Sequence, residues 1–133
     1  MKKNINIEKL LEKCNFEVLS KLSEQADDTK VYAYSLDDDH TMVVTKNVKD
    51  KLELRYYEAL VYMYYLKHKD ENFEIKIDSK EYETTDEAID LLIPDKNFKK
   101  QIKKSDKKLS KRYEVPEWVI EKKKIKTLYD LTV

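Results

Sequence analysis

The stretch VKDKLELRYYEALVYMYYLKH, residues 48–68, is the most apolar part of the chain, and the rest is organised around it. Some of its apolar side chains recur at steps of three or four, which places them on one face of a helix: Val48, Leu52, Tyr56, Ala59, Met63 and Leu66. Further apolar residues cover much of the remaining circumference: Leu60, Val61, Tyr64 and Tyr65. A helix that is apolar nearly all round is normally buried on more than one side. We therefore predict a central helix in which Tyr57, Ala59, Leu60 and Met63 are largely buried.

Length and composition limit the class of protein. At 133 residues the chain has the usual length of one domain and is long enough to bury a core. Charged residues make up 41%, against roughly 25% in average proteins, so the surface is unusually ionic. No run approaches the ~18 apolar residues of a membrane span, and the first residues alternate charged with apolar side chains, unlike a secretory signal. With Cys14 as the single cysteine, we predict a cytoplasmic protein that does not contact membranes.

The chain contains no glycine, where average usage of about 7% would give roughly nine. Glycine-rich phosphate loops, dinucleotide-binding fingerprints and nucleophile elbows all need glycine where a side chain would clash. This composition argues against those enzyme classes, and we predict a non-catalytic protein without a cofactor. Turns must use Asp, Asn, Ser and Lys instead, which favours a helix-rich fold.

The N-terminal segment has two interpretations. Asn6 is a suitable N-cap, and the apolar residues that follow keep helical spacing, so we predict a helix over residues 7–25. The alternative ends this helix near Cys14 and makes residues 16–22 a strand, because apolar side chains also alternate there.

Three further segments have the composition or the alternation of strands: residues 30–36, 41–46 and 73–77. The first two are joined by a short hairpin connection at residues 37–40. Asn47 and Asp50 resemble a capping pair for the central helix. We predict an α+β fold in which a small antiparallel sheet of about three strands packs on the central tyrosine-rich helix.

The last third of the chain is predicted to be helical. Thr84 and Glu87 form a capping-box pattern for a short helix that Pro94 ends. We predict the next helix over residues 95–113, and a last helix after Pro116. The residues expected to anchor the last helix are Trp118, Val119 and Ile125.

The formal charge of the whole chain is zero, but it is unevenly distributed. Residues 1–94 hold 14 Lys and Arg against 21 Asp and Glu, whereas residues 95–133 hold 13 against 6. We predict a single domain, 1–133, with an acidic α+β core over 1–94 and a basic helical part over 95–133. Such an asymmetry indicates a charged partner or docking of one part on the other.

The basic residues concentrate in one window, over residues 96–112. They are Lys96, Lys99, Lys100, Lys103, Lys104, Lys107, Lys108, Lys111 and Arg112. A narrow apolar seam runs through the window at Phe98, Ile102, Leu109 and Tyr113. Lysines on the other sides suit an acidic protein or the phosphates of a nucleic acid, while a solvated surface and docking on the acidic half are the alternatives. Because only one of the nine is Arg, readout of base sequence is disfavoured.

Two other groups of residues are relevant to catalysis. Asp37, Asp38, Asp39 and His40 have the chemistry of a metal site, but neighbours in a turn point in different directions, and we predict no metal there.

Glu74-Ile75-Lys76 lies on a predicted strand. With the alternative N-terminal interpretation, the order of elements along the chain is helix, three strands, helix, strand. That order resembles the core of the PD-(D/E)xK nucleases, which implies a metal-dependent nuclease. The family carries its Glu-x-Lys before the central helix, where this chain has Val44-Thr45-Lys46.

The leading hypothesis is a small binding protein that inhibits or regulates a larger protein. The Lys-, Ile- and Asn-rich composition without glycine is similar to small proteins of low-GC bacteria and their phages or plasmids, where inhibitors of host defence are frequent. The alternative is a nonspecific nucleic-acid-binding protein that uses residues 96–112. A degenerate or metal-dependent nuclease is the third hypothesis.

Overall fold

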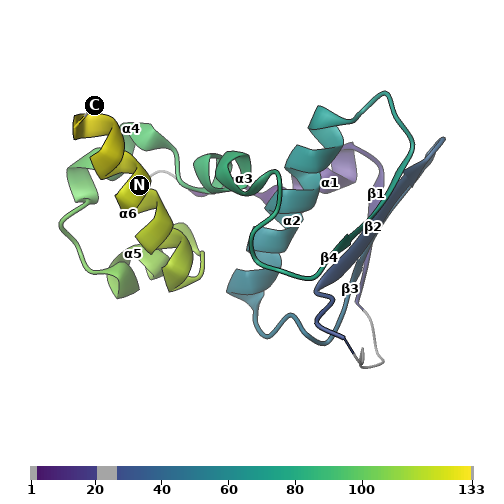
Figure 1. Ribbon diagram of the computed structural model, residues 1–133, viewed down its shortest axis with the longest axis horizontal. Helices are drawn as coiled ribbons and strands as arrows, with labels where there is room; N and C mark the ends of the chain where they lie inside the picture. Colours follow the sequence, from purple (N-terminus) through teal and green to yellow (C-terminus); the bar gives the residue numbers. More distant parts are fainter. Residues whose placement is uncertain (1–2, 21–26, 133) are drawn as a thin grey trace.

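The structure is a computed structural model that describes residues 3–20 and 27–132 as a single compact domain (Figure 1). The first elements are α1 (Ile7–Lys13), β1 (Phe16–Ser20), β2 (Val31–Leu36), β3 (Asp39–Val44), α2 (Lys51–Lys67) and β4 (Phe73–Ile77). They are followed by α3 (Thr85–Leu92), α4 (Asp95–Phe98), η1 (Lys99–Gln101), α5 (Asp106–Tyr113) and α6 (Glu117–Thr132). The sheet forms one side of the molecule, α1 and α2 lie against it, and α4 to α6 lie beyond them (Figure 1). The predicted α+β class with a helical C-terminal third is confirmed.

The N-terminal helix is shorter than predicted. α1 ends at Lys13, so the single helix over residues 7–25 is wrong, and the alternative with a strand after it is correct for the described residues. Asn6 caps α1 as predicted, since its side chain accepts a backbone N–H at 3.1 Å. Asn15 then adopts a left-handed conformation with φ of 61°, which short polar side chains tolerate, and this redirects the chain into β1. Residues 21–26, in which both interpretations placed the end of their element, lie outside the described residues.

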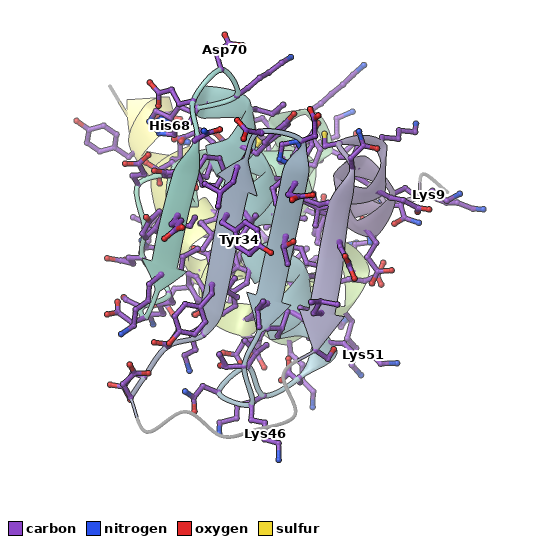
Figure 2. All side chains as sticks on the ribbon, turned by 90° about the vertical axis from the view of Figure 1, so that its right-hand side faces the viewer. Lys9, Tyr34, Lys46, Lys51, His68 and Asp70 are labelled. Carbon is purple, nitrogen blue, oxygen red and sulfur yellow. The ribbon has the colours of Figure 1, made fainter. Side chains whose placement is uncertain are left out.

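The strands form a four-stranded mixed sheet in the order β1-β3-β2-β4. β2 pairs antiparallel with β3 and β4, and β1 adds a parallel strand beside β3 to the three that were predicted. Ala33 pairs with Met42 and Ile75 on the inner face, where alternate side chains enter or pack against the core. On the outer face Tyr34 pairs with Glu74. Figure 2 looks onto this outer face, and no described element covers it.

The central helix supplies the middle of the core. Three of its predicted core residues are at most 1% exposed: Tyr57, Ala59 and Leu60. Met63 is only partly buried, because it lies one turn further toward the exposed end of α2. The helix begins at Lys51, and its N-cap is Asp50 rather than Asn47. The Asp50 side chain accepts the Glu53 N–H at 2.9 Å.

The basic window does not form one helix. α4, η1 and α5 replace the predicted helix over residues 95–113, and the chain turns between η1 and α5. Ser105 caps α5, its hydroxyl accepting the Lys108 N–H at 3.2 Å. A local cap competes with continuation of the helix, and like charges at steps of three and four disfavour continuation as well. The predicted packing seam is nevertheless found, with Phe98, Leu109 and Tyr113 buried and Ile102 partly buried.

Helices α3 and α6 lie where the sequence predicts them, but some of their predicted contacts are not found. Thr84 makes no side-chain cap for α3, and its hydroxyl instead donates to the Leu60 carbonyl of α2 at 2.9 Å. Val119 is buried in α6 as predicted and Trp118 is partly buried, but Ile125 is 63% exposed. Ile125 lies off the buried stripe of this helix, which is Val119, Ile120, Lys123 and Thr127. None of the described helices has the length and apolar character needed to cross a membrane.

Candidate functional site

The basic window lies on α4, η1 and α5, in the helical part away from the sheet (Figure 1). Eight of its residues are exposed lysines, which we call the lysine surface: Lys96, Lys99, Lys100, Lys103, Lys104, Lys107, Lys108 and Lys111. Because the window is not one helix, the lysines that recur at steps of four, Lys99, Lys103, Lys107 and Lys111, do not line a single helical face. All of these side chains nevertheless reach solvent.

The lysine surface differs from the other cationic segment, α6, in its ion pairs. None of its eight lysines forms a salt bridge with a residue that the structure describes. The lysines of α6 do pair: Lys122 with Glu81, Lys123 with Asp90 and Asp95, Lys124 with Asp106, and Lys126 with Asp90. Among the described residues, docking of the basic part on the acidic core therefore uses lysines of α6, namely Lys122, Lys123 and Lys126, whereas the lysine surface adds no ion pair to it.

Lys123 is the centre of that docking. Its side chain is fully buried, and its Nζ donates to Asp90 at 2.9 Å and also to Asp95. Burial raises the pKa of Asp90, but hydrogen bonds from Lys126 and Lys123 outweigh it and hold that pKa below its ordinary value. A buried ammonium needs such partners because an unpaired one would be expensive to desolvate. The lysines of α6 are therefore part of the fold.

Arg112, the ninth basic residue of the window, has contacts within the fold. It is half-buried, and its Nη1 donates to the Asn4 Oδ1 at 3.0 Å. The guanidinium also lies 5.0 Å from the centre of the Tyr113 ring. Its carbonyl accepts from the Asn4 side chain at 2.9 Å, so Arg112 joins the N-terminal segment to α5. The exposed cations of the window are accordingly the eight lysines.

The aspartate-rich hairpin separates His40 from its acidic neighbours. Asp37 and Asp38 form the turn between β2 and β3, and Asp37 is left-handed with φ of 53°. His40 is half-buried on β3, with its Nδ1 2.7 Å from the Ser35 hydroxyl and its ring 5.3 Å from that of Tyr65. Within residues 3–20 and 27–132, no group of three or more His, Cys, Asp or Glu side chains is arranged to hold a metal ion.

The element order of the nuclease core is present, but its chemical residues are placed differently. Glu74 and Lys76 lie on the outer face of β4, and Lys76 Nζ pairs with Asp27 at 2.7 Å. Hydrogen bonds from Lys76 and Thr29 lower the pKa of Asp27 to about 2. Thr45, at the family's Glu-x-Lys position, is buried and its hydroxyl donates to the Thr29 carbonyl at 2.6 Å.

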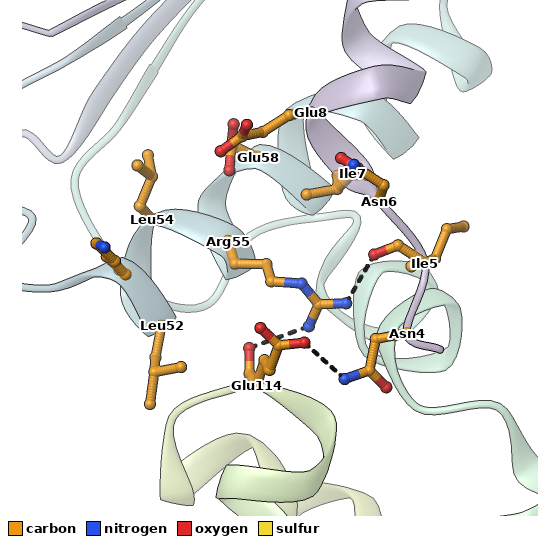
Figure 3. Close-up of a pocket in the computed structure, with 11 residues that line it drawn as sticks. Asn4, Ile5, Asn6, Ile7, Glu8, Leu52, Leu54, Arg55, Glu58 and Glu114 are labelled. Atoms are coloured by element: carbon orange, nitrogen blue, oxygen red, sulfur yellow. Dashed lines mark hydrogen bonds between the residues drawn. The ribbon is translucent and has the colours of Figure 1, made fainter. Parts of the chain in front are cut away.

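A pocket of about 480 Å³ lies where the N-terminal segment, the start of α2 and Glu114 meet (Figure 3). Sequence reasoning missed it. The available signal was Glu58, a carboxylate within the most apolar stretch of the chain. Glu58 is 3% exposed, and burial together with the charge of Glu8 raises its pKa to about 7, although Arg55 opposes the rise. A buried carboxyl with a strongly raised pKa in a pocket is a candidate for function.

No family model, curated protein or solved structure matches this chain, so the assignment of a function rests on these sites alone.

Proposed function

We propose that this is a small cytoplasmic, non-catalytic binding protein whose lysine surface docks on an acidic surface of a larger protein, which it inhibits or regulates. The observation that carries the proposal is the contrast between two sets of lysines. Those of α6 are paired with carboxylates of the fold, whereas the lysine surface has no carboxylate partner among the described residues. Neighbouring like charges repel one another, and an acidic partner removes that repulsion.

The chemistry of the surface favours recognition by charge. Lysine ammonium groups are compact and strongly hydrated, and they attract an acidic surface without the fixed geometry of an arginine fork. Such groups raise the association rate by long-range steering, which weakens as salt increases. The composition of this chain is similar to that of small phage and plasmid proteins. Together with the small size of the chain, this similarity supports an inhibitor encoded by a mobile element.

Nucleic acid is the second candidate partner, because the same lysines suit a phosphate backbone. The two aromatic rings of the window, Phe98 and Tyr113, are buried, so they provide no platform on which single-stranded bases could stack. A duplex needs no such platform. A nucleic-acid function is therefore proposed for duplexes only, with binding independent of sequence.

The experiment compares two variants with equal changes of charge. The test variant replaces Lys99, Lys103, Lys107 and Lys111 with Glu, and the control replaces Lys3, Lys9, Lys46 and Lys69, which are also exposed. Wild type and both variants are immobilised and exposed to extract from cells that encode the protein, with and without nuclease treatment. We expect one acidic protein to be retained by wild type and control and lost from the test variant. Loss of only nuclease-sensitive material identifies the second candidate, and equal retention by all three proteins contradicts both.

A further inference from the structure

Glu58 is a buried carboxyl without a hydrogen-bond partner among the described residues, and it lines the pocket shown in Figure 3. It extends from α2 toward the start of α1, where Glu8 lies near it. Desolvating a carboxylate without a compensating hydrogen bond is costly. The Glu58 oxygens are not among the fully enclosed, unpartnered polar atoms of the described residues, so they open into the pocket and can accept from a donor bound there.

Arg55 lies in the same pocket but is not that donor. Its Nη1 donates to the Tyr113 carbonyl at 2.6 Å. Figure 3 shows two further bonds, from Nη1 to the Glu114 carbonyl at 3.0 Å and from Nη2 to the Ile5 carbonyl at 3.0 Å. These bonds use the guanidinium to join the N-terminal segment and the end of α5 to α2. Arg55 therefore contributes charge to the pocket, but no hydrogen bond to Glu58.

The lining of the pocket defines the chemistry of a ligand. Its acidic residues are Glu8, Glu58 and Glu114, and its basic residues are Lys51 and Arg55, which leaves one excess negative charge when Glu58 is ionised. The Glu114 carboxylate already accepts from Asn4 at 2.8 Å, so the lining carboxylates without a hydrogen-bond donor among the described residues are Glu8 and Glu58. The apolar part of the lining consists of Ile5, Ile7, Leu52 and Leu54.

We propose that this pocket binds a small aliphatic ammonium ion, whose nitrogen lies between Glu58 and Glu8 and whose carbon chain contacts the apolar lining. The volume, about 480 Å³, is within the usual range for small-molecule sites. The excess negative charge disfavours an anion. Two carboxylates supply fewer oxygen ligands than a calcium site normally takes, and the described part of the chain holds no group of three or more His, Cys, Asp or Glu side chains arranged for a metal ion.

Binding of such a cation must be coupled to a proton. Because burial and Glu8 raise the pKa of Glu58 to about 7, a substantial fraction of this carboxyl is protonated near neutral pH. An ammonium ion stabilises the charged form and lowers that pKa, so binding releases a proton. The affinity should therefore rise as the pH increases through 7. Glu8, Glu114, Lys51 and Arg55 are the other charged groups that line the pocket.

The test is calorimetric titration of the full chain with 1,4-diaminobutane and n-butylamine at pH 6 and pH 8, with 1,4-butanediol as the uncharged control. The variants are Glu58→Gln and, as a matched control, Glu12→Gln, an exposed residue of α1 outside this pocket. We expect saturable binding of the amines to wild type and Glu12→Gln, at least about tenfold weaker binding to Glu58→Gln, and tighter binding at pH 8. Amide chemical shifts of wild type should change at residues 4–8 and 52–58.

Three results would overturn the proposal. The first is no saturable binding of either amine at millimolar concentrations. The second is equal affinity of wild type and Glu58→Gln, and the third is equal binding of the diol. Because Glu58→Gln removes a buried acid, the variant is expected to fold at least as well as wild type, and its far-ultraviolet circular dichroism is measured before the titration.

Discussion

Replacing Glu58 with Gln should raise the free energy of unfolding at pH 8 and leave it nearly unchanged at pH 4. Burial and the neighbouring Glu8 raise the pKa of Glu58 from 4.5 to about 7 in the folded state, while Arg55 opposes the rise. Below pH 4.5 the carboxyl is protonated in both states. As the pH rises from 4.5 to 7, the unfolded state loses this proton first, so the unfolded state gains stability relative to the folded one. Above 7 both states are ionised and the loss is complete.

The magnitude follows from the same pKa values. A difference of one pH unit between the pKa values of the two states is worth about 1.4 kcal/mol, so ionisation of Glu58 costs the fold on the order of 3 kcal/mol. Gln cannot ionise and should recover most of this at pH 8. Urea denaturation of wild type, Glu58→Gln and the control Glu12→Gln at pH 4, 6 and 8 measures it. If the difference in free energy of unfolding between Glu58→Gln and wild type does not grow with pH, the raised pKa of a buried Glu58 is refuted.

Three other comparisons test the packing, the backbone and the buried ion pairs. Leu60→Ala should cost about 2–5 kcal/mol in chemical denaturation and Met63→Ala clearly less, because only Leu60 is fully buried. Glu114→Gly should be more stable than Glu114→Ala by about 1 kcal/mol. Both variants lose the carboxylate, but only Ala keeps the backbone strain of a φ of 56°. Equal melting temperatures of the two variants would exclude that strain. Lys123→Met should stay within about 1 kcal/mol of wild type, because it removes the buried ammonium while Asp90 and Asp95, whose side chains are 42% and 67% exposed, remain solvated. A loss of several kcal/mol in urea would show that the ion pairs themselves stabilise α6.

The sequence predicts best where a signal is long and local. The central helix shows its apolar face over several turns, so its existence follows from spacing. Its apolar character nearly all round predicts the burial of Tyr57 and Leu60. Asn6 also caps α1 as its position suggests. Short segments are harder, because the apolar residues after Cys14 fit a helix and a strand equally well. Pairing with β3, which is distant in sequence, decides for the strand.

The candidate sites show the same limit. Lysine-rich composition locates the basic window, but it does not reveal that α6 rather than this window pairs with the acidic core. The pocket at Glu58 was not predictable, because the raised pKa of Glu58 depends on its burial and on Glu8, and only the fold buries the one and brings the other near. Local capping by Ser105 also interrupts the helix over residues 95–113, although every lysine of the surface stays exposed.

The most direct measurement of the central claim determines stability and affinity on one variant, in which Lys99, Lys103, Lys107 and Lys111 are all replaced by Glu. Because these lysines make no ion pair with described residues, the melting temperature should equal or exceed that of wild type. Affinity for the acidic partner retained by wild type should fall sharply, and the plot of log affinity against log salt should flatten. An unchanged affinity per folded molecule together with a lowered melting temperature would mean that these lysines serve the fold, and would contradict the account.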